Sequence, residues 1–266
     1  MFLISGLGKN ESMIEETASN SSKTAAGKVA IVGAGPGDPE LVTLKARRLI
    51  ESCDCLLHDH LIDSALLGWC APECEVICVG KRAGRHCMDQ SEISRLMVEK
   101  ATEGRDVVRL KGGEPGVFGR LGEELVALRA AGIDYEVVPA VTSAFAAAAS
   151  LGIPLTDRDC ASGVALLTGH EQPARPGSDG VDWRTWGAMD RTTLVIYMGV
   201  QHLEQITSDL VDGGRAVDTP AAAVQWASTP MERRVVGTLG DLALKVNEAA
   251  LGAPAVLIVG EVVGRR

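Results

Sequence analysis

The residues best suited to acid–base and anion chemistry follow predicted strands. Asp59 comes after an apolar run in "LLHDHLI", where its carboxylate could act as a base or could cap the next helix. Lys81, Arg82 and Arg85 lie together in "VGKRAGRH", directly after another strand. In a chain with a net charge of -9, such a cluster indicates an anionic substrate, although basic clusters also occur on solvated faces.

A glycine-rich loop, "VGAGPGD", follows the first predicted strand at 29–33 and precedes a helical pattern. This placement is typical of dinucleotide-binding loops, so a nicotinamide-dependent dehydrogenase is one alternative. However, Asp38 stands where close helix packing would need a third glycine, and Pro36 removes a backbone N–H that a diphosphate would use. The loop therefore favours a ligand without a diphosphate.

A second glycine-rich loop, "LKGGEPGVFGR", follows another strand and leads into a helix near 119–124. Gly112 and Gly113 would allow the backbone to approach a ligand, and the Glu114 carboxylate could bind an amine or a hydroxyl. A tight turn with a glutamate near a helix N-terminus is the structural alternative.

Alternating strands and helices must position these residues. The pattern predicts two α/β domains with mainly parallel sheets and an interdomain cleft. We expect a disordered tail at 1–27, an N-terminal domain at 28–145 and a C-terminal domain at 146–266. The predicted strands are 29–33, 53–58, 75–79, 106–110, 135–138, 163–168, 192–198, 221–226, 232–236 and 255–260.

Composition excludes several classes of function. The acidic balance argues against nucleic-acid binding, and no apolar stretch is long enough to cross a membrane. Among the seven cysteines, Cys70, Cys74 and Cys78 have helical spacing, which suggests a metal site. Pro72 and a strand-like pattern interrupt that helix, so we expect reduced core thiols, no metal and a cytoplasmic protein.

Taken in order, the motifs are similar to those of one enzyme family. "VGAGPGDPELVTLKA", "GKRAGRH", "VVRLKGGEP", "GIPLT" and "YMG" occur along residues 28–264. They resemble the uroporphyrinogen-III C-methyltransferases, which have the tetrapyrrole methylase fold. The resemblance implies two α/β domains with the active site between them, a homodimer, a tetrapyrrole substrate and the methyl donor S-adenosyl-L-methionine.

The resemblance also implies roles for individual residues. Asp59 and Lys81 match proton-handling positions, and Arg120 and Glu123 match positions tied to catalysis. The arginines that would bind the anionic substrate are Arg120, Arg158, Arg82 and Arg85. The cofactor contacts fall on Pro36, Gly112, Gly113, Glu114, Val117, Thr142, Ser143, Met198 and Ala227.

This chain departs from the family pattern at several of these places. Glu114 replaces an aspartate in the family's GGDP motif, and Gly116 replaces a bulky residue after the proline. Leu121 replaces a glycine, His58 replaces a tyrosine, and Trp226-Ala227 replaces Asn-Gly. Each change falls close to a position implied to contact the cofactor or to handle protons.

The implied reaction transfers an activated methyl group to a pyrrole carbon. Methylation at carbons 2 and 7 would give precorrin-2, the branch point toward sirohaem and cobalamin. Asp59 is the first candidate base for the proton that the methylated macrocycle must lose. Two further alternatives are a methyltransferase that acts on a later precorrin and a non-catalytic tetrapyrrole-binding protein.

Overall fold

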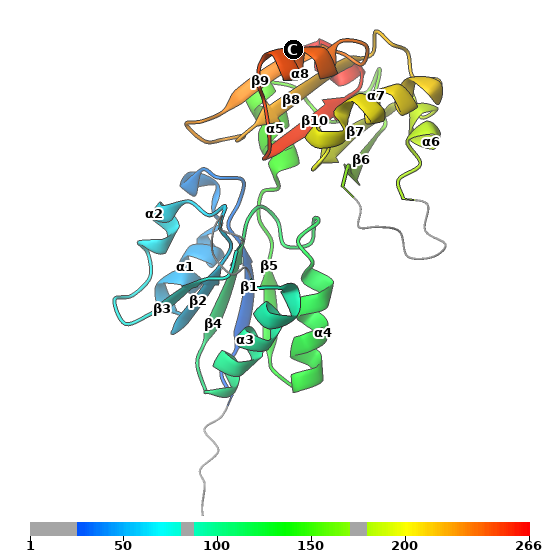
Figure 1. The fold of residues 1–266 in the computed structure, drawn as a ribbon. Coiled ribbons are helices and arrows are strands. Elements are labelled where there is room, and N and C mark those ends of the chain that lie inside the picture. The colour runs from blue at the N-terminus through cyan, green and yellow to red at the C-terminus, as the bar shows by residue number, and fades with distance from the viewer. Residues whose placement is uncertain (1–25, 81–87, 171–179) are drawn as a thin grey trace, which may run out of the picture.

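The computed structural model describes residues 26–80, 88–170 and 180–266, and it places two β-sheets in two lobes (Figure 1). All but two residues of the predicted tail lie outside these ranges. Within the described ranges, no helix combines the length and the apolar character that crossing a membrane requires.

The first sheet has five parallel strands in the order β3-β2-β4-β1-β5. All five occur close to their predicted positions. Its elements are β1 (Val29–Gly33), η1 (Pro39–Leu41), α1 (Leu44–Ser52), β2 (Cys55–His58), α2 (Ser64–Leu67), β3 (Glu75–Cys78), α3 (Gln90–Thr102), β4 (Val107–Lys111), α4 (Leu121–Ala131) and β5 (Tyr135–Val138).

Helices cover both faces of this sheet. Ile50 of α1 packs in one apolar cluster with Val32 and Leu56, whereas Met97 of α3 and Leu128 of α4 pack in another on the opposite face. The neighbouring strands β1 and β4 therefore send their connections to opposite faces. Ligands bind at such a switch point in parallel sheets, beyond the carboxyl ends of the strands.

The second sheet has the order β6-β7-β10-β8-β9. Only β6 and β7 pair in parallel, while the other three pairs are antiparallel, so the prediction of a mainly parallel sheet was wrong here. The short connection from β8 to β9 permits only an antiparallel hairpin. The elements are α5 (Ser143–Leu151), β6 (Gly163–Thr168), α6 (Trp183–Gly187), β7 (Thr192–Tyr197), η2 (Val200–His202), α7 (Leu203–Asp212), β8 (Pro220–Gln225), β9 (Arg233–Thr238), α8 (Leu242–Glu248), β10 (Ala255–Val259) and η3 (Glu261–Arg265).

Helix α5 packs with the second sheet along its whole length. Ala144, Ala147 and Leu151 share a buried cluster with Val195 and Ile258 of that sheet. The domain boundary stays a prediction, and this packing favours a position just before Ser143 rather than within the helix.

The first core is tested by two changes on one helix. Leu128 of α4 is fully buried, whereas Val126 of the same helix is 64% exposed. We expect Leu128→Ala to lower the free energy of unfolding by about 2–5 kcal/mol, because it leaves a cavity among tightly packed side chains. The control Val126→Ala should change it by no more than about 0.5 kcal/mol. Urea unfolding followed by circular dichroism measures both, and equal losses would contradict the packing described here.

Candidate active site

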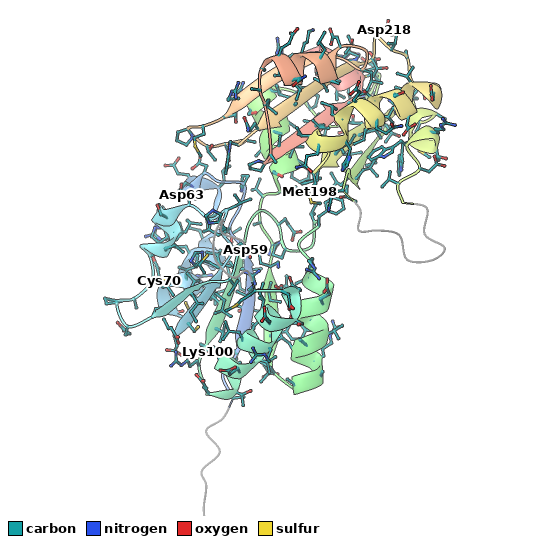
Figure 2. The ribbon with its side chains drawn as sticks, in the orientation of Figure 1. Asp59, Asp63, Cys70, Lys100, Met198 and Asp218 are labelled. Atoms are coloured by element: carbon teal, nitrogen blue, oxygen red, sulfur yellow. The ribbon has the colours of Figure 1, made fainter. Side chains whose placement is uncertain are left out.

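Asp59 lies directly after β2, at the carboxyl end of the first sheet (Figure 2). Its Oδ1 accepts a hydrogen bond from Arg109 Nη2 at 2.5 Å, and its Oδ2 accepts one from the backbone N–H of Gly112 at 3.3 Å. The side chain is 31% exposed, so it is fixed from two directions and still reaches solvent. The alternative capping role belongs to Asp63, whose side chain accepts from Ala65 N–H in α2.

A group of buried charges lies behind Asp59. Only 2% of the Arg109 side chain on β4 is exposed, and none of the Glu124 side chain on α4. Glu124 Oε1 accepts from Arg109 Nε at 3.0 Å, Lys111 Nζ at 3.0 Å and Gln90 Nε2 at 3.1 Å. Arg109 therefore connects the buried Glu124 to Asp59 and holds the Asp59 carboxylate in place.

The buried charges balance only when all four groups are counted. Arg109 and Lys111 supply two cations, while Glu124 and Asp59 supply two anions. Burial lowers the pKa of the Lys111 ammonium below its ordinary value, and Arg109 adds to this effect while Glu124 opposes it. Glu124 Oε2 is buried without a hydrogen-bond partner among the described residues. Because Arg109 and Lys111 compensate the buried carboxylate, loss of either cation would leave negative charge buried with less compensation, which is costly.

The two glycine loops are hydrogen-bonded to each other at the switch point. Gly113 N–H donates to the Gly35 carbonyl at 2.8 Å, and Gly35 N–H donates to the Gly113 carbonyl at 3.2 Å. Both residues have positive φ angles, 75° and 68°, which favour glycine. A Cβ atom on Gly113 would meet no heavy atom within 4 Å, so the backbone here has open space beside it.

Tyr197, at the end of β7, lies where the two lobes meet. Its hydroxyl is 2.6 Å from Thr142 Oγ1 and accepts a hydrogen bond from Ala144 N–H at 3.3 Å, at the start of α5. Burial raises the pKa of this phenol above its ordinary value. The ring of Phe118, from the second glycine loop, lies 5.1 Å from the Tyr197 ring, centroid to centroid. An aromatic contact therefore joins the loop after β4 to the second sheet.

The first glycine loop makes a second connection between the lobes. Asp38 N–H donates to Ser228 Oγ at 3.3 Å, and a Cβ atom on Gly37 would collide with Cγ2 of Thr229. The turn after β8 therefore closes directly on the loop after β1. The loops after β1, β4 and β8 thus meet the end of β7 and the start of α5 at one junction between the two sheets.

Comparison with known proteins agrees with this arrangement. The family profile described as Tetrapyrrole (Corrin/Porphyrin) Methylases matches residues 28–243. The chain belongs to the tetrapyrrole methylase family. Among its relatives, an S-adenosyl-L-methionine-dependent uroporphyrinogen III methyltransferase of Methanosarcina barkeri is 48% identical over 237 residues, which make up 89% of this chain and 92% of that protein.

Other relatives of this tetrapyrrole methylase are longer or have known structures. A siroheme synthase of Azotobacter vinelandii is 44% identical over 96% of this chain, which spans only 54% of that protein. A solved Thermus thermophilus uroporphyrin-III C-methyl transferase, complexed with S-adenyl homocysteine, is 42% identical with a TM-score of 0.75 and covers 90% of this chain and 100% of its own. A solved cobalt precorrin-4 methyltransferase is 30% identical with a TM-score of 0.79. The match covers 89% of this chain and 95% of that protein.

The predicted cofactor-binding residues of this tetrapyrrole methylase come from both sheets. Pro36, Gly112, Gly113, Glu114 and Val117 follow β1 and β4 of the first sheet. Thr142 and Ser143 start α5, and Met198 and Ala227 follow β7 and β8. Met198 has a positive φ of 55°, and positive φ angles at Trp226 and Ser228 flank Ala227. All nine lie at the junction, and their contact with the cofactor stays a prediction.

Glu114 and Gly116 are two departures from the family pattern that fit each other. Glu114 Oε2 folds back to accept a hydrogen bond from Gly116 N–H at 2.7 Å. A Cβ atom on Gly116 would lie only 3.1 Å from that oxygen, so the glycine makes room for the longer carboxylate. An acidic acceptor beside open glycine backbone, paired with a first loop whose Pro36 disfavours a diphosphate, fits a sulfonium nucleoside such as S-adenosyl-L-methionine.

The predicted charged residues are only partly brought together. Arg120 and Glu123 form a bidentate ion pair on α4, with both hydrogen bonds at 2.8 Å. This pairing raises the pKa of Arg120 and lowers the pKa of Glu123, which keeps Glu123 ionised. Arg158 lies apart in the linker before β6, where it is exposed. The remaining predicted residues, Lys81, Arg82 and Arg85, lie outside the described residues.

Several residues of the buried charge group and of the junction were not assigned a role from the sequence. The sequence context of Glu124 is that of an ordinary glutamate on a helix, and Phe118 and Tyr197 are aromatic residues far apart in the sequence. The one available signal was Arg109, a cation inside the otherwise apolar strand "VVRL", because a buried cation needs a buried anion.

Adjacent glutamates on α4 provide a test of the buried charges. Glu124 is fully buried between two cations, whereas the Glu123 side chain is 54% exposed in a surface pair. We expect Glu124→Gln to lower the free energy of unfolding by about 3–5 kcal/mol, because it leaves the buried cations with too little negative charge. Glu123→Gln should cost at most about 1 kcal/mol. Chemical denaturation measures both, and a neutral Glu124→Gln would remove this network as a stability determinant.

Proposed function

We propose that this chain is an S-adenosyl-L-methionine-dependent uroporphyrinogen-III C-methyltransferase that methylates carbons 2 and 7 to give precorrin-2. The observation that carries the proposal is the 48% identity to the Methanosarcina barkeri methyltransferase across nearly the full length of both chains. The similarity to a structure complexed with S-adenyl homocysteine supports the same cofactor. The whole-protein activity of the longer siroheme synthase relatives is not part of this proposal, since the chain spans about half of them.

The protein's main task in this reaction is alignment. When bound, the cofactor supplies a methyl group on a sulfonium sulfur, which is already activated for displacement. Gly112 and Gly113 would offer backbone to the cofactor, with the Glu114 carboxylate beside them. Met198 and Ala227 would close on it from the second sheet. Holding the pyrrole carbon in line with the methyl group would provide most of the rate enhancement.

Asp59 would handle the proton that the methylated macrocycle loses. Arg109 and the Gly112 N–H occupy one lone pair on each carboxylate oxygen and fix its orientation. Each oxygen keeps further acceptor capacity. Lys81 would be its proton-handling partner.

The substrate is a polycarboxylate, so the protein needs cations beside its reacting carbon. Arg120, Arg158, Arg82 and Arg85 are the proposed contacts, because guanidinium groups bind carboxylates with two parallel hydrogen bonds. Glu123 already occupies Arg120 in this way, so a substrate carboxylate would have to displace it or share the guanidinium. We further propose a cytoplasmic homodimer, and sedimentation of the purified chain tests the dimer.

A second candidate is a methyltransferase that acts on a later precorrin. The TM-score of 0.79 to a cobalt precorrin-4 methyltransferase favours this alternative, although the identity is only 30%. Product mass after incubation with reduced uroporphyrinogen III separates the two. Addition of two methyl groups supports the proposal, and an unchanged substrate beside a bound cofactor supports the alternative.

Cofactor binding is tested at Glu114. We expect Glu114→Asp to bind S-adenosylhomocysteine as tightly as the wild type or more tightly, because aspartate can still accept from the N–H two residues ahead. Glu114→Ala should lose about 1.5–3 kcal/mol of binding, as expected for a hydrogen bond to a charged group. Titration calorimetry gives both values, with the exposed Glu99→Asp on α3 as the control. No heat of binding in any form, wild type included, would remove the methyltransferase assignment.

The base role is tested at Asp59. Asp59→Asn keeps the size of the side chain but removes the basic charge, so we expect single-turnover methylation to slow by about 10²–10⁴ while both ligands still bind. The matched control is Asp63→Asn, because asparagine caps a helix as well as aspartate and activity should persist. The assay uses freshly reduced uroporphyrinogen III with saturating cofactor. Equal rates for Asp59→Asn and wild type would transfer the base role to Lys81 or Glu123.

A further inference from the structure

Three cysteine thiols gather at the amino end of the first sheet, remote from the junction. Cys53 is the C-cap of α1, Cys70 follows α2, and Cys74 precedes β3. Their sulfur atoms all lie within 4.8 Å of one another, and the Cys53 and Cys74 sulfurs are 3.6 Å apart. Figure 2 shows Cys70 on the flank of the first lobe, away from Asp59 and Met198.

Local backbone structure brings these residues together. Glu75 N–H donates to the Asp54 carbonyl at 3.0 Å, which aligns the segments that carry Cys74 and Cys53. A turn over Pro72, in which Cys74 N–H donates to the Ala71 carbonyl at 3.0 Å, leads the chain from α2 into β3. The cluster therefore combines Cys53 with two of the three cysteines that the helical spacing suggested.

The neighbouring cysteines are excluded for geometric reasons. Cys78 lies on β3, where it is exposed and four residues farther along an extended chain than Cys74. Cys55 is buried in the apolar cluster on the opposite face of the sheet from Cys53. Cys78 therefore provides an internal comparison for any property of the cluster.

The sulfur positions suit a shared ligand. Zinc binds thiolates at about 2.3 Å, so two sulfurs that share a tetrahedral zinc ion lie about 3.8 Å apart. The separation between Cys53 and Cys74 is already close to this value. We propose that Cys53, Cys70 and Cys74 bind one thiophilic metal ion of the zinc or copper(I) class. Zinc would take a water as its fourth ligand, whereas copper(I) is satisfied by three thiolates.

Binding leaves the oxidation state of sulfur and metal unchanged. Each thiol that becomes a ligand releases its proton to solvent, so three thiols release three protons for one metal ion. Burial raises the pKa of the Cys53 thiol, and it raises that of Cys70 to about 11.

The metal would stabilise the fold by cross-linking segments of the chain, and it would take no part in methyl transfer. It would tie the end of α1 to both ends of the segment between α2 and β3. Asp59 follows the opposite, carboxyl end of β2, so the cluster and the proposed base are separated by the length of that strand. Metal removal should lower the melting temperature and leave cofactor binding unchanged.

The test uses the full chain, reduced and stripped of metal with a chelator. Zinc and, anaerobically, copper(I) are titrated separately against chromophoric chelators, and metal content is counted by mass spectrometry after gel filtration. Wild type should bind one equivalent of one of the two ions, with Cys70→Ser and Cys74→Ser at least about ten-fold weaker. Cys78→Ser and Cys160→Ser are the controls and should bind like wild type. Circular dichroism verifies the fold of every variant.

A spectroscopic measurement distinguishes metal binding at the three cysteines from weak binding elsewhere on the protein. Cobalt(II) added to the stripped protein should give thiolate charge-transfer absorbance that is absent in Cys74→Ser and retained in Cys78→Ser. The proposal is overturned if wild type retains no more zinc or copper(I) than a variant with all three cysteines changed to serine. It is also overturned if Cys70→Ser and Cys74→Ser bind as tightly as wild type. A Cys53–Cys74 disulfide in purified protein, with no metal uptake after reduction, would assign the cluster to redox chemistry instead.

Discussion

A cation buried in a central strand needs an anion buried with it, and this constraint organises the first sheet. Arg109 lies on β4, in the middle of the sheet, with almost no exposure. Glu124 must therefore face it from α4, which sets how that helix lies against the strands. The other end of the same guanidinium holds Asp59, and Asp59 in turn accepts from the Gly112 N–H. The Arg109 side chain thus links the buried charge of Glu124, the position of α4 and the proposed base Asp59. Through Asp59 it also reaches the second glycine loop.

The strand positions could be predicted from the sequence because apolar runs between glycine and polar segments mark buried strands well. The direction of the strands in the second sheet could not be predicted, because a run such as "AVLIV" is equally apolar in a parallel and in an antiparallel sheet. The same holds for the site. Motifs identified the glycine loops and Asp59, because their residue types stand out locally. Glu124, Phe118 and Tyr197 depend on partners that only the fold brings near, 15 residues away for Arg109 and Glu124 and farther for the ring pair.

The junction of the two sheets relies on small residues and unusual backbone angles. Gly37 admits Thr229, and positive φ angles recur at Phe118, Met198, Trp226 and Ser228, all in loops that meet there. Left-handed backbone at non-glycine residues costs free energy and persists only where surrounding contacts enforce it. Phe118 is held by its ring contact with Tyr197, and Ser228 by its hydrogen bond from Asp38 N–H. The two sheets therefore hold each other's loops in shape.

The fit between Glu114 and Gly116 has a consequence for how this loop could be moved into another protein. The Glu114 carboxylate lies against the space that a side chain at 116 would enter, and it accepts a hydrogen bond from the N–H of that same residue. A side chain at 116 would bring its Cβ to 3.1 Å from this carboxylate, which would then have to shift. The two residues are sterically coupled, and a transplant of this loop into another chain should carry both together.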